Sequence, residues 1–243
     1  MSPIYAIGDI HGELGLLEHA LDLVEADGGT EALTVFLGDY VDRGPDSRKV
    51  LDLLVSGQKL GRNWVFLKGN HDRMFEWFLQ TPSRIDPNLF IDLSWLHERL
   101  GGQNTLMSYG INFSERYRLN ALHSAALSAV PDSHLKFLAN CELSYETDDI
   151  FFCHAGVRPE VELRKQSEDD LLWIREEFHN YMGRYPKLIV HGHTPIEHAT
   201  HYTNRVNLDS GSGYGKSLTA AVFEGTKCYS LNPKGRVQLL ATR

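Results

Sequence analysis

The chain has 243 residues, of which 42% are hydrophobic, so it can bury a core as one domain. Its formal net charge of −8 disfavours a nucleic-acid partner bound through bulk electrostatics, and no apolar run approaches the roughly 18 residues that span a bilayer. The three cysteines, Cys141, Cys153 and Cys228, are widely spaced and no export signal precedes Ile4, so we expect a cytoplasmic protein without disulfides or thiolate metal sites.

The N-terminal half alternates short β-branched or aromatic runs with longer amphipathic stretches. Strands are expected at 4–7, 33–37 and 64–67, and each runs into a Gly-Asp or Gly-Asn pair that a helical pattern follows. This alternation is typical of strand-helix-strand units in a partly parallel sheet. Because loops after the carboxyl ends of such strands gather at one edge, we expect the three loops to converge.

From about 74 to 140 the pattern turns helical and is punctuated by prolines and by a Gly-Gly pair, which predicts a helical cap inserted over the sheet edge. No linker divides the chain, so 1–243 is expected to form a single domain. The rest is expected to be mostly sheet, with one helix near 169–181 and strands at 143–146, 150–153, 187–190, 206–208, 218–223 and 228–231.

Two motifs follow the first two expected strands. Asp9 and His11 are two residues apart on an extended segment, so their side chains point the same way and can bind one ion. Asp39 has two oxygens that can bridge two ions, and the planar guanidinium of Arg43 suits phosphate oxygens. Taken singly, each motif also fits an ordinary turn or, for Asp42 and Arg43, a surface ion pair.

Three further loops, each after an expected strand, carry candidate ligands. The first carries Asn70 and His71, the second His154 and the third His193. Each alone has an ordinary explanation, because Asn often caps a helix and a buried histidine often bonds a carbonyl. Together, five strand ends carry Asp, Asn or His, and oxygen and imidazole ligands without thiolates suit manganese, iron or zinc. Metal pairs roughly 3.5–4 Å apart are a known route to in-line displacement at phosphorus, so we expect a two-metal phosphoesterase.

The ordered motifs resemble those of the calcineurin-like metallophosphoesterases, and within them the phosphoprotein phosphatases of bacterial and phage type. They are GDIHG at 8–12, GDYVDRG at 38–44, GNHD at 69–72, HAGV at 154–157 and HGHTP at 191–195. The resemblance covers nearly the whole chain. It implies an α/β fold, a two-sheet β-sandwich flanked by helices, with the metals at one edge of the sheets.

Carried over residue by residue, the resemblance implies two divalent ions, with manganese preferred and iron or zinc as alternatives. The ligands it implies are Asp9, His11 and the bridging Asp39 for the first ion, and Asp39, Asn70, His154 and His193 for the second. His191 receives no role and is expected to be a structural strand residue. Pro195 stands where many relatives outside the phosphatase branch carry another histidine, which favours that branch.

The same resemblance assigns the chemistry. A hydroxide held between the ions is expected to attack phosphorus in line, and His71, oriented by Asp42, to protonate the leaving oxygen. Arg43 and Arg175 are expected to bind the phosphate. For Arg175 the alternative is an exposed helix arginine beside Glu176 and Glu177.

The substrate is less certain from sequence. Phosphoprotein phosphatases usually carry Glu where this chain has Asp72, and diadenosine tetraphosphate hydrolases commonly carry Asp there. Those hydrolases typically lack the acidic residue that stands here as Asp42, and position 72 is expected only to shape the following helix. We therefore expect a protein phosphatase acting on phosphorylated proteins or peptides, with a dinucleoside polyphosphate hydrolase as the alternative. The serine/threonine type is preferred, and the sequence leaves tyrosine and histidine phosphates open. A metal-free binding module is a second alternative.

Two further features are set aside. The run 211–217 resembles a nucleotide-binding loop, but Ser210 stands where such a loop needs glycine, and we expect a hairpin connection near the metal edge. His198 and His201 are expected in a solvated loop. No nucleic acid or membrane partner is expected, and the oligomeric state is open.

Overall fold

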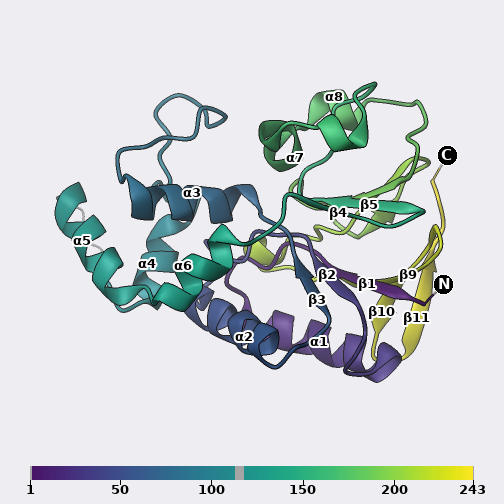
Figure 1. Ribbon diagram of the computed structural model, residues 1–243, viewed down its shortest axis with the longest axis horizontal. Coiled ribbons are helices and arrows are strands. Elements are labelled where there is room, and N and C mark those ends of the chain that lie inside the picture. The colour runs from purple at the N-terminus through teal and green to yellow at the C-terminus, as the bar shows by residue number, and fades with distance from the viewer. Residues whose placement is uncertain (1, 113–117, 243) are drawn as a thin grey trace.

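Two β-sheets lie face to face in the computed structural model, which describes residues 2–112 and 118–242 (Figure 1). The strands are β1 (Ile4–Ile7), β2 (Thr34–Phe36), β3 (Trp64–Phe66), β4 (Ser144–Glu146), β5 (Ile150–Cys153), β6 (Leu188–His191), β7 (Thr200–His201), β8 (Arg205–Asn207), β9 (Ala220–Glu224), β10 (Lys227–Asn232) and β11 (Gly235–Leu239). The α-helices are α1 (Leu14–Gly28), α2 (Ser47–Lys59), α3 (Asn70–Gln80), α4 (Gly102–Ser108), α5 (Leu119–Ala129), α6 (Asp132–Ala139), α7 (Glu168–Trp173) and α8 (Glu176–His179), and short 3₁₀ turns span Leu163–Lys165 and Ser212–Tyr214.

The first sheet has the strand order β11-β10-β9-β1-β2-β3. Its strands β1, β2 and β3 are adjacent and parallel, with Tyr5 opposite Thr34 and Thr34 opposite Trp64. Parallel neighbours need a crossover connection, and α1 and α2 supply it. The expected strand-helix-strand units are confirmed, and the three loops leave the same edge of the sheet.

The second sheet has the order β4-β5-β6-β8-β7. Here β5, β6 and β8 run parallel, with Phe152 opposite Val190 and Val190 opposite Val206. The fourth motif follows β5 directly, and the fifth begins in the last residue of β6. This sheet therefore also delivers its motif histidines from the carboxyl ends of parallel strands.

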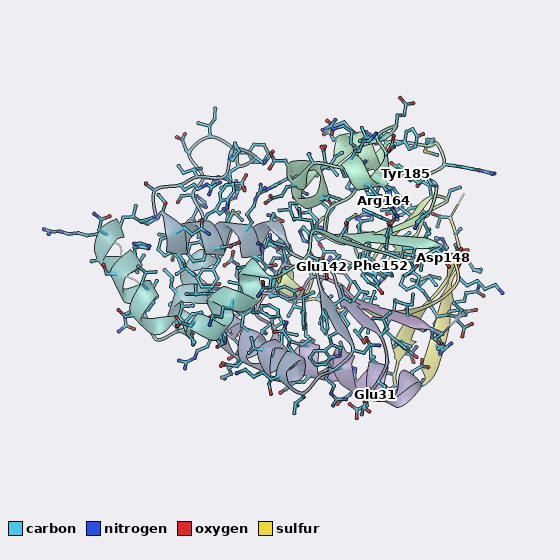
Figure 2. All side chains as sticks on the ribbon, viewed as in Figure 1. Glu31, Glu142, Asp148, Phe152, Arg164 and Tyr185 are labelled. Atoms are coloured by element: carbon cyan, nitrogen blue, oxygen red, sulfur yellow. The ribbon has the colours of Figure 1, made fainter. Side chains whose placement is uncertain are left out.

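Alternating side chains along the strands build the layers. In β1, Ala6 packs into the core between the sheets, whereas Tyr5 and Ile7 pack toward the helices of the first outer face. In β5, Phe152 lies between the sheets (Figure 2), and Phe151 packs with α7 and α8 on the other outer face. Successive strand residues point to opposite faces, so both faces of each sheet are covered. The expected sandwich flanked by helices is confirmed.

The range 74–140 contains most of α3 and all of α4, α5 and α6 among its described residues. Its apolar residues, such as Phe75, Leu106 and Phe137, share one core with Phe36 of β2 and with Leu51 of α2. In Figure 1 these helices lie together at the left of the sheets. The helical character is as expected, while the boundary of a cap and the single-domain division stay predictions.

Three expectations about the C-terminal half are wrong in detail. His201 belongs to the short strand β7, where its Nδ1 atom lies 3.2 Å from the Leu239 carbonyl, so only His198 sits in an exposed loop. The segment 211–217 joins β8 of one sheet to β9 of the other, so it is a crossover and not a hairpin. The helix near 169–181 is two short helices, α7 and α8. The edge strand β11 was not expected; three of its five residues, Gly235, Val237 and Gln238, are exposed.

The described helices include none that is long and apolar enough to cross a bilayer. All three cysteines are buried free thiols. Cys153 ends β5 and packs with Ile189 and Phe178 on the outer face of the second sheet. It is a core residue, although it directly precedes a motif histidine.

Candidate metal centre

The carboxyl ends of the parallel strands of both sheets lie at the same edge of the sandwich, and the motif side chains come together there. The His154 ring, after β5, places Nδ1 2.8 Å from the Leu37 carbonyl at the end of β2. The backbone N–H of His193, after β6, donates to Asp9 Oδ2, after β1, at 2.9 Å. Contacts between residues as distant in sequence as Asp9 and His193 therefore close one cluster from both sheets.

Two groups of potential ligand atoms share Asp39. His11, Asp39 and His71 form one group, and Asp39, His154 and His193 form the other, with the atoms of each group within 4.8 Å of one another. All of these side chains are buried. The shared carboxylate is the arrangement that a bridging ligand requires. The first group contains His71, for which the sequence predicts another role. It does not contain Asp9, which the sequence predicts as a ligand.

Asn70 stands between the two histidines of the second group. Its Oδ1 atom lies 2.9 Å from His154 Nε2 and 2.9 Å from His193 Nδ1. Burial lowers the pKa of His154 to about 4, so this ring is neutral, and its Nδ1–H donates to Leu37. His154 Nε2 then carries a lone pair that faces an amide oxygen. Two facing lone pairs attract a cation, so this donor set fits a metal ion.

Asp9 also fits a cation. Its Oδ1 atom is buried and has no hydrogen-bond partner among the described residues. Burial and the neighbouring Asp209 and Asp39 carboxylates raise the pKa of Asp9 well above its usual range. A methyl group at Gly192 would overlap this carboxylate, and one at Gly69 would overlap that of Asp39. The chain thus keeps both carboxylates in spaces that only glycine allows.

The backbone at this edge is unusual. Seven described residues other than glycine have positive φ, and five of them are site residues, namely His11, Asp39, Asp42, Arg43 and His193, with φ between 49° and 74°. This left-handed conformation costs free energy for residues with a side chain, although Asp and His tolerate it better than most. Such residues cluster at functional sites, where the surrounding contacts hold them in place.

Asp72 provides much of that support. Its carboxylate accepts hydrogen bonds from the backbone N–H groups of Asp39 at 2.7 Å, Tyr40 at 2.9 Å and Gly69 at 2.8 Å. It therefore ties the loop after β2 to the start of α3. The expectation that position 72 only shapes the following helix is wrong, because two of its three donors lie on another loop.

His71 is held by Asp42. The His71 Nδ1 atom lies 2.6 Å from Asp42 Oδ2, which also accepts from Trp95 Nε1 at 2.8 Å, while Asp42 Oδ1 accepts from Thr105 at 2.6 Å. Burial raises the pKa of Asp42 well above its usual range and lowers the pKa of His71 well below its own. The two side chains favour their uncharged forms and hold the imidazole in one orientation, with Nε2 3.1 Å from the Arg43 guanidinium.

Two arginines border the cluster. Arg43 contacts the Nε2 atoms of His11 and His71, and its guanidinium lies 4.6 Å from the centre of the Tyr214 ring. Arg175 lies at the break between α7 and α8, and its NH1 donates to the Thr194 hydroxyl at 3.4 Å. Arg175 is outside a helix, so that part of the alternative is wrong, but it is exposed beside Glu176 and Glu177, as the alternative expects. Its phosphate-binding role stays a prediction.

Several residues at this edge were not expected from sequence. Asp209 is 3% exposed, and burial raises its pKa. Its charge in turn raises the pKa values of Asp9 and Asp39. Asp209 directly follows the expected strand at 206–208 and lies two residues after β8, so the same strand-end signal could have found it. Trp95 and Thr105 had no such signal, because they come from helical or loop segments. His191, as expected, is a buried strand residue, and its Nε2 accepts from Arg205 at 3.2 Å.

A cleft of about 960 Å³ opens beside the cluster. Arg43, Arg175 and Tyr214 line its base. One wall is the segment that follows α3, including Asn88, Leu89, Phe90 and Arg99, and the other is formed by Arg158 and by residues of α7 and α8, including Trp173. A ligand held by the two arginines would therefore extend between these walls.

Comparisons with known proteins agree with this geometry. The family model described as calcineurin-like phosphoesterase matches residues 2–223. The asymmetrical bis(5′-nucleosyl)-tetraphosphatase PrpE of Anoxybacillus flavithermus is 27% identical over 241 residues, covering 88% of this chain and 87% of the relative. Serine/threonine-protein phosphatase 1 of Salmonella typhimurium is 29% identical over 228 residues, covering 90% of each chain. A cold-active protein-tyrosine phosphatase of a psychrophilic Shewanella species shares the fold, with a TM-score of 0.65 at 17% identity over 99% of this chain and 81% of the other. These three are named for different substrates.

Proposed function

Since the chain belongs to the calcineurin-like phosphoesterase family, we propose that it is a metal-dependent phosphomonoesterase that acts as a protein phosphatase of the serine/threonine type. Phosphoester hydrolysis follows from the family. The choice of substrate is the proposal, and the relatives named above do not agree on it.

The ligands we propose are Asp9, His11 and Asp39 for one ion, and Asp39, Asn70, His154 and His193 for the other. The buried, unpartnered Oδ1 of Asp9 and the lone pair of His154 support this set. Manganese is the preferred metal, because oxygen and imidazole donors without thiolates suit it. When bound, two divalent ions supply the positive charge that stabilises phosphoryl oxygens and an activated water for in-line attack.

The pairing of His71 with Asp42 carries the proposal. Asp42 holds Nδ1 of the ring at 2.6 Å, so Nε2 is the nitrogen left to face the substrate, 3.1 Å from Arg43. We assign Arg43 and Arg175 to the non-bridging phosphate oxygens, where a guanidinium matches two oxygens at once. A proton on His71 Nε2 would then lie next to the phosphate and could pass to the leaving oxygen.

The cleft supports a protein or peptide substrate. The side chains that line it are apolar, basic and acidic, such as Phe90, Arg99 and Glu176. A phosphorylated loop presents side chains of all these kinds on either side of the phosphate. This mixed lining can therefore contact the residues of a peptide on either side of its phosphate.

One observation favours a dinucleoside polyphosphate as a second candidate. Tyr214 is 58% exposed beside Arg43, and Phe90 is 84% exposed in the same cleft. Exposed aromatic faces near arginines can stack on a base while the arginines bind phosphates.

Turnover by manganese-loaded protein separates these possibilities. We expect phosphoserine and phosphothreonine peptides to be hydrolysed with a higher kcat/KM than phosphotyrosine peptides or diadenosine tetraphosphate, and chelated protein to be inactive. Preferential cleavage of diadenosine tetraphosphate would replace the proposal with the second candidate. Protein that binds no transition metal and cleaves nothing in the panel would be a binding module.

A further inference from the structure

Arg73 joins its own helix, α3, to two segments that line the cleft. It lies in α3, two residues after His71, and is 2% exposed. Its Nε and NH2 groups donate to Asp86 Oδ2 at 3.0 and 2.7 Å, and its NH1 group donates to Asp169 at 2.8 Å and Glu168 at 3.2 Å. One guanidinium thus binds carboxylates from the segment after α3 and from α7.

Asp86 extends this junction. It is 2% exposed, and its Oδ2 atom also accepts from Trp173 Nε1 at 3.3 Å. Its Oδ1 atom accepts from the backbone and side-chain N–H groups of Asn88 at 3.0 and 3.1 Å. The Asn88 side chain in turn reaches Asp169 at 3.3 Å. We call Arg73, Asp86, Glu168 and Asp169 the Arg73 junction.

The segment 81–101 needs such support. It contains no helix or strand, and in Figure 1 it projects from the body of the molecule after α3. Buried Trp95 and Leu96 fix its later part in the core, so the part before them depends on contacts such as those of Asp86. Burying Arg73 and Asp86 carries a desolvation cost, which their mutual hydrogen bonds offset only in a well-defined geometry. The pair therefore holds the segment in one place relative to α3.

The junction also sets the opposite wall. Asp169 and Trp173 are on α7, and the Trp173 ring lies 5.9 Å from the His193 ring. Asn88, Leu89 and Phe90 are on the facing wall. Both walls are thus anchored to the same guanidinium, which belongs to the helix that begins with Asn70 and His71.

We propose that Arg73 is a positioning residue that fixes the two walls of the cleft relative to each other and so determines how well extended phosphorylated substrates bind. The proposal rests on the proposed function for the nature of the substrate. A small phosphate ester held at the base of the cleft need not touch the walls, whereas a phosphopeptide lies between them. Loss of the junction should therefore weaken peptide binding more than it affects a small ester.

The sharpest variant is the double substitution Glu168→Gln with Asp169→Asn. It removes the charged link to α7 but leaves Arg73 paired with buried Asp86, so the protein should still fold. The matched control is Glu176→Gln with Glu177→Gln, which makes the same change in net charge in the same cleft, away from Arg73. Removing negative charge alone should strengthen binding of an anionic peptide. Loss of the junction should weaken it, so the two effects have opposite signs.

With manganese-loaded protein, we expect the Glu168→Gln/Asp169→Asn variant to raise KM for a phosphoserine peptide about fivefold or more. For p-nitrophenyl phosphate, we expect kcat/KM to change by a factor less than half as large. The Glu176→Gln/Glu177→Gln control should lower KM for the peptide. A lower peptide KM in both double variants, or an equal loss on the two substrates, would overturn the proposal.

Hydrogen exchange tests the junction without any assay of activity. Amides in 81–101 should exchange at least threefold faster in the Glu168→Gln/Asp169→Asn variant than in the control. Equal exchange in the two proteins contradicts the positioning role. If the parent protein hydrolyses neither substrate, the proposed function fails, and the exchange result still decides whether Arg73 holds the walls.

Arg73→Lys gives a second test, because lysine keeps the charge but not the planar fork. Arg84→Lys is its control: both arginines lie over the Trp77 ring, at 4.7 and 3.2 Å, but among the described residues Arg84 forms no ion pair. We expect only Arg73→Lys to raise the peptide KM and to speed exchange in 81–101. The same behaviour in both variants would assign the effect to the Trp77 contact instead.

Discussion

The base and the walls of the cleft are built in different ways. The base consists of loops at the ends of parallel strands, and its side chains, such as Asp39 and His154, are buried and bonded to the backbone of neighbouring loops. The walls consist of the segment 81–101 and the short helices α7 and α8, and Phe90 on them is 84% exposed. Under the proposed function, the chemistry that every substrate needs is placed on rigid strand ends, and selection among substrates is left to loops and short helices.

The largest effect should come from the bridging position at the base. Asp39→Asn keeps the shape of the side chain but removes the charge that both ligand groups share. We expect loss of bound metal, by elemental analysis, and loss of activity by about a thousandfold or more, because metal ions contribute several kcal/mol to such reactions. Asp22→Asn, on the exposed face of α1, is the control. Full activity in Asp39→Asn would remove the two-ion assignment.

His71→Asn tests the chemistry at the base of the cleft without removing a proposed metal ligand. We expect kcat to fall by about 10²–10⁴-fold, the usual contribution of a general acid, while metal content stays at the parental level. The loss should shrink for substrates whose leaving group needs no proton, such as p-nitrophenyl phosphate compared with a phosphoserine peptide. A variant that loses metal would instead make His71 a ligand, as its place beside His11 and Asp39 would allow.

Asp72→Asn probes how the base is held together. The amide cannot accept all three backbone N–H bonds that the carboxylate accepts from Asp39, Tyr40 and Gly69. Leaving a buried donor unpaired costs about 1–3 kcal/mol, so thermal unfolding should occur at a lower temperature. Loss of such a supporting contact typically costs about 10–100-fold in metal affinity. Unchanged stability and metal affinity would contradict the support that we assign to Asp72.

The same contrast explains what the sequence predicts and what it does not. Strands β1, β2, β3, β5 and β6 have strong apolar patterns and end in short motifs, so their order predicts a common edge and the residues gathered there. Asp209 follows an equally regular strand and was missed only because no motif marks it. The support from Trp95 and Thr105, and the Arg73 junction, depend on tertiary contacts between segments without periodicity, which local patterns do not encode.

The smallest effect should come from a partly exposed ion pair on the wall. Arg158 donates to the two Asp170 oxygens, at 3.1 Å and 2.5 Å, and Arg158 is 46% exposed. Burial raises the pKa of Asp170, but hydrogen bonds from Arg158 and Ser167 lower it more, so the net pKa is below its ordinary value of 3.8. A carboxyl with a lowered pKa in the folded state stabilises the protein above the unfolded pKa and loses that effect as pH falls through the folded value.

We therefore expect Asp170→Asn to lower the free energy of unfolding by less than about 1 kcal/mol at pH 7, because solvent and salt screen exposed pairs. The difference from the parent should disappear on acidification below the lowered pKa of Asp170. Urea unfolding at several pH values measures it, with Asp148→Asn as a control on the far side of the second sheet. A cost at pH 7 as large as that of Asp72→Asn would mean that the walls are held as firmly as the base, which would contradict the contrast between them.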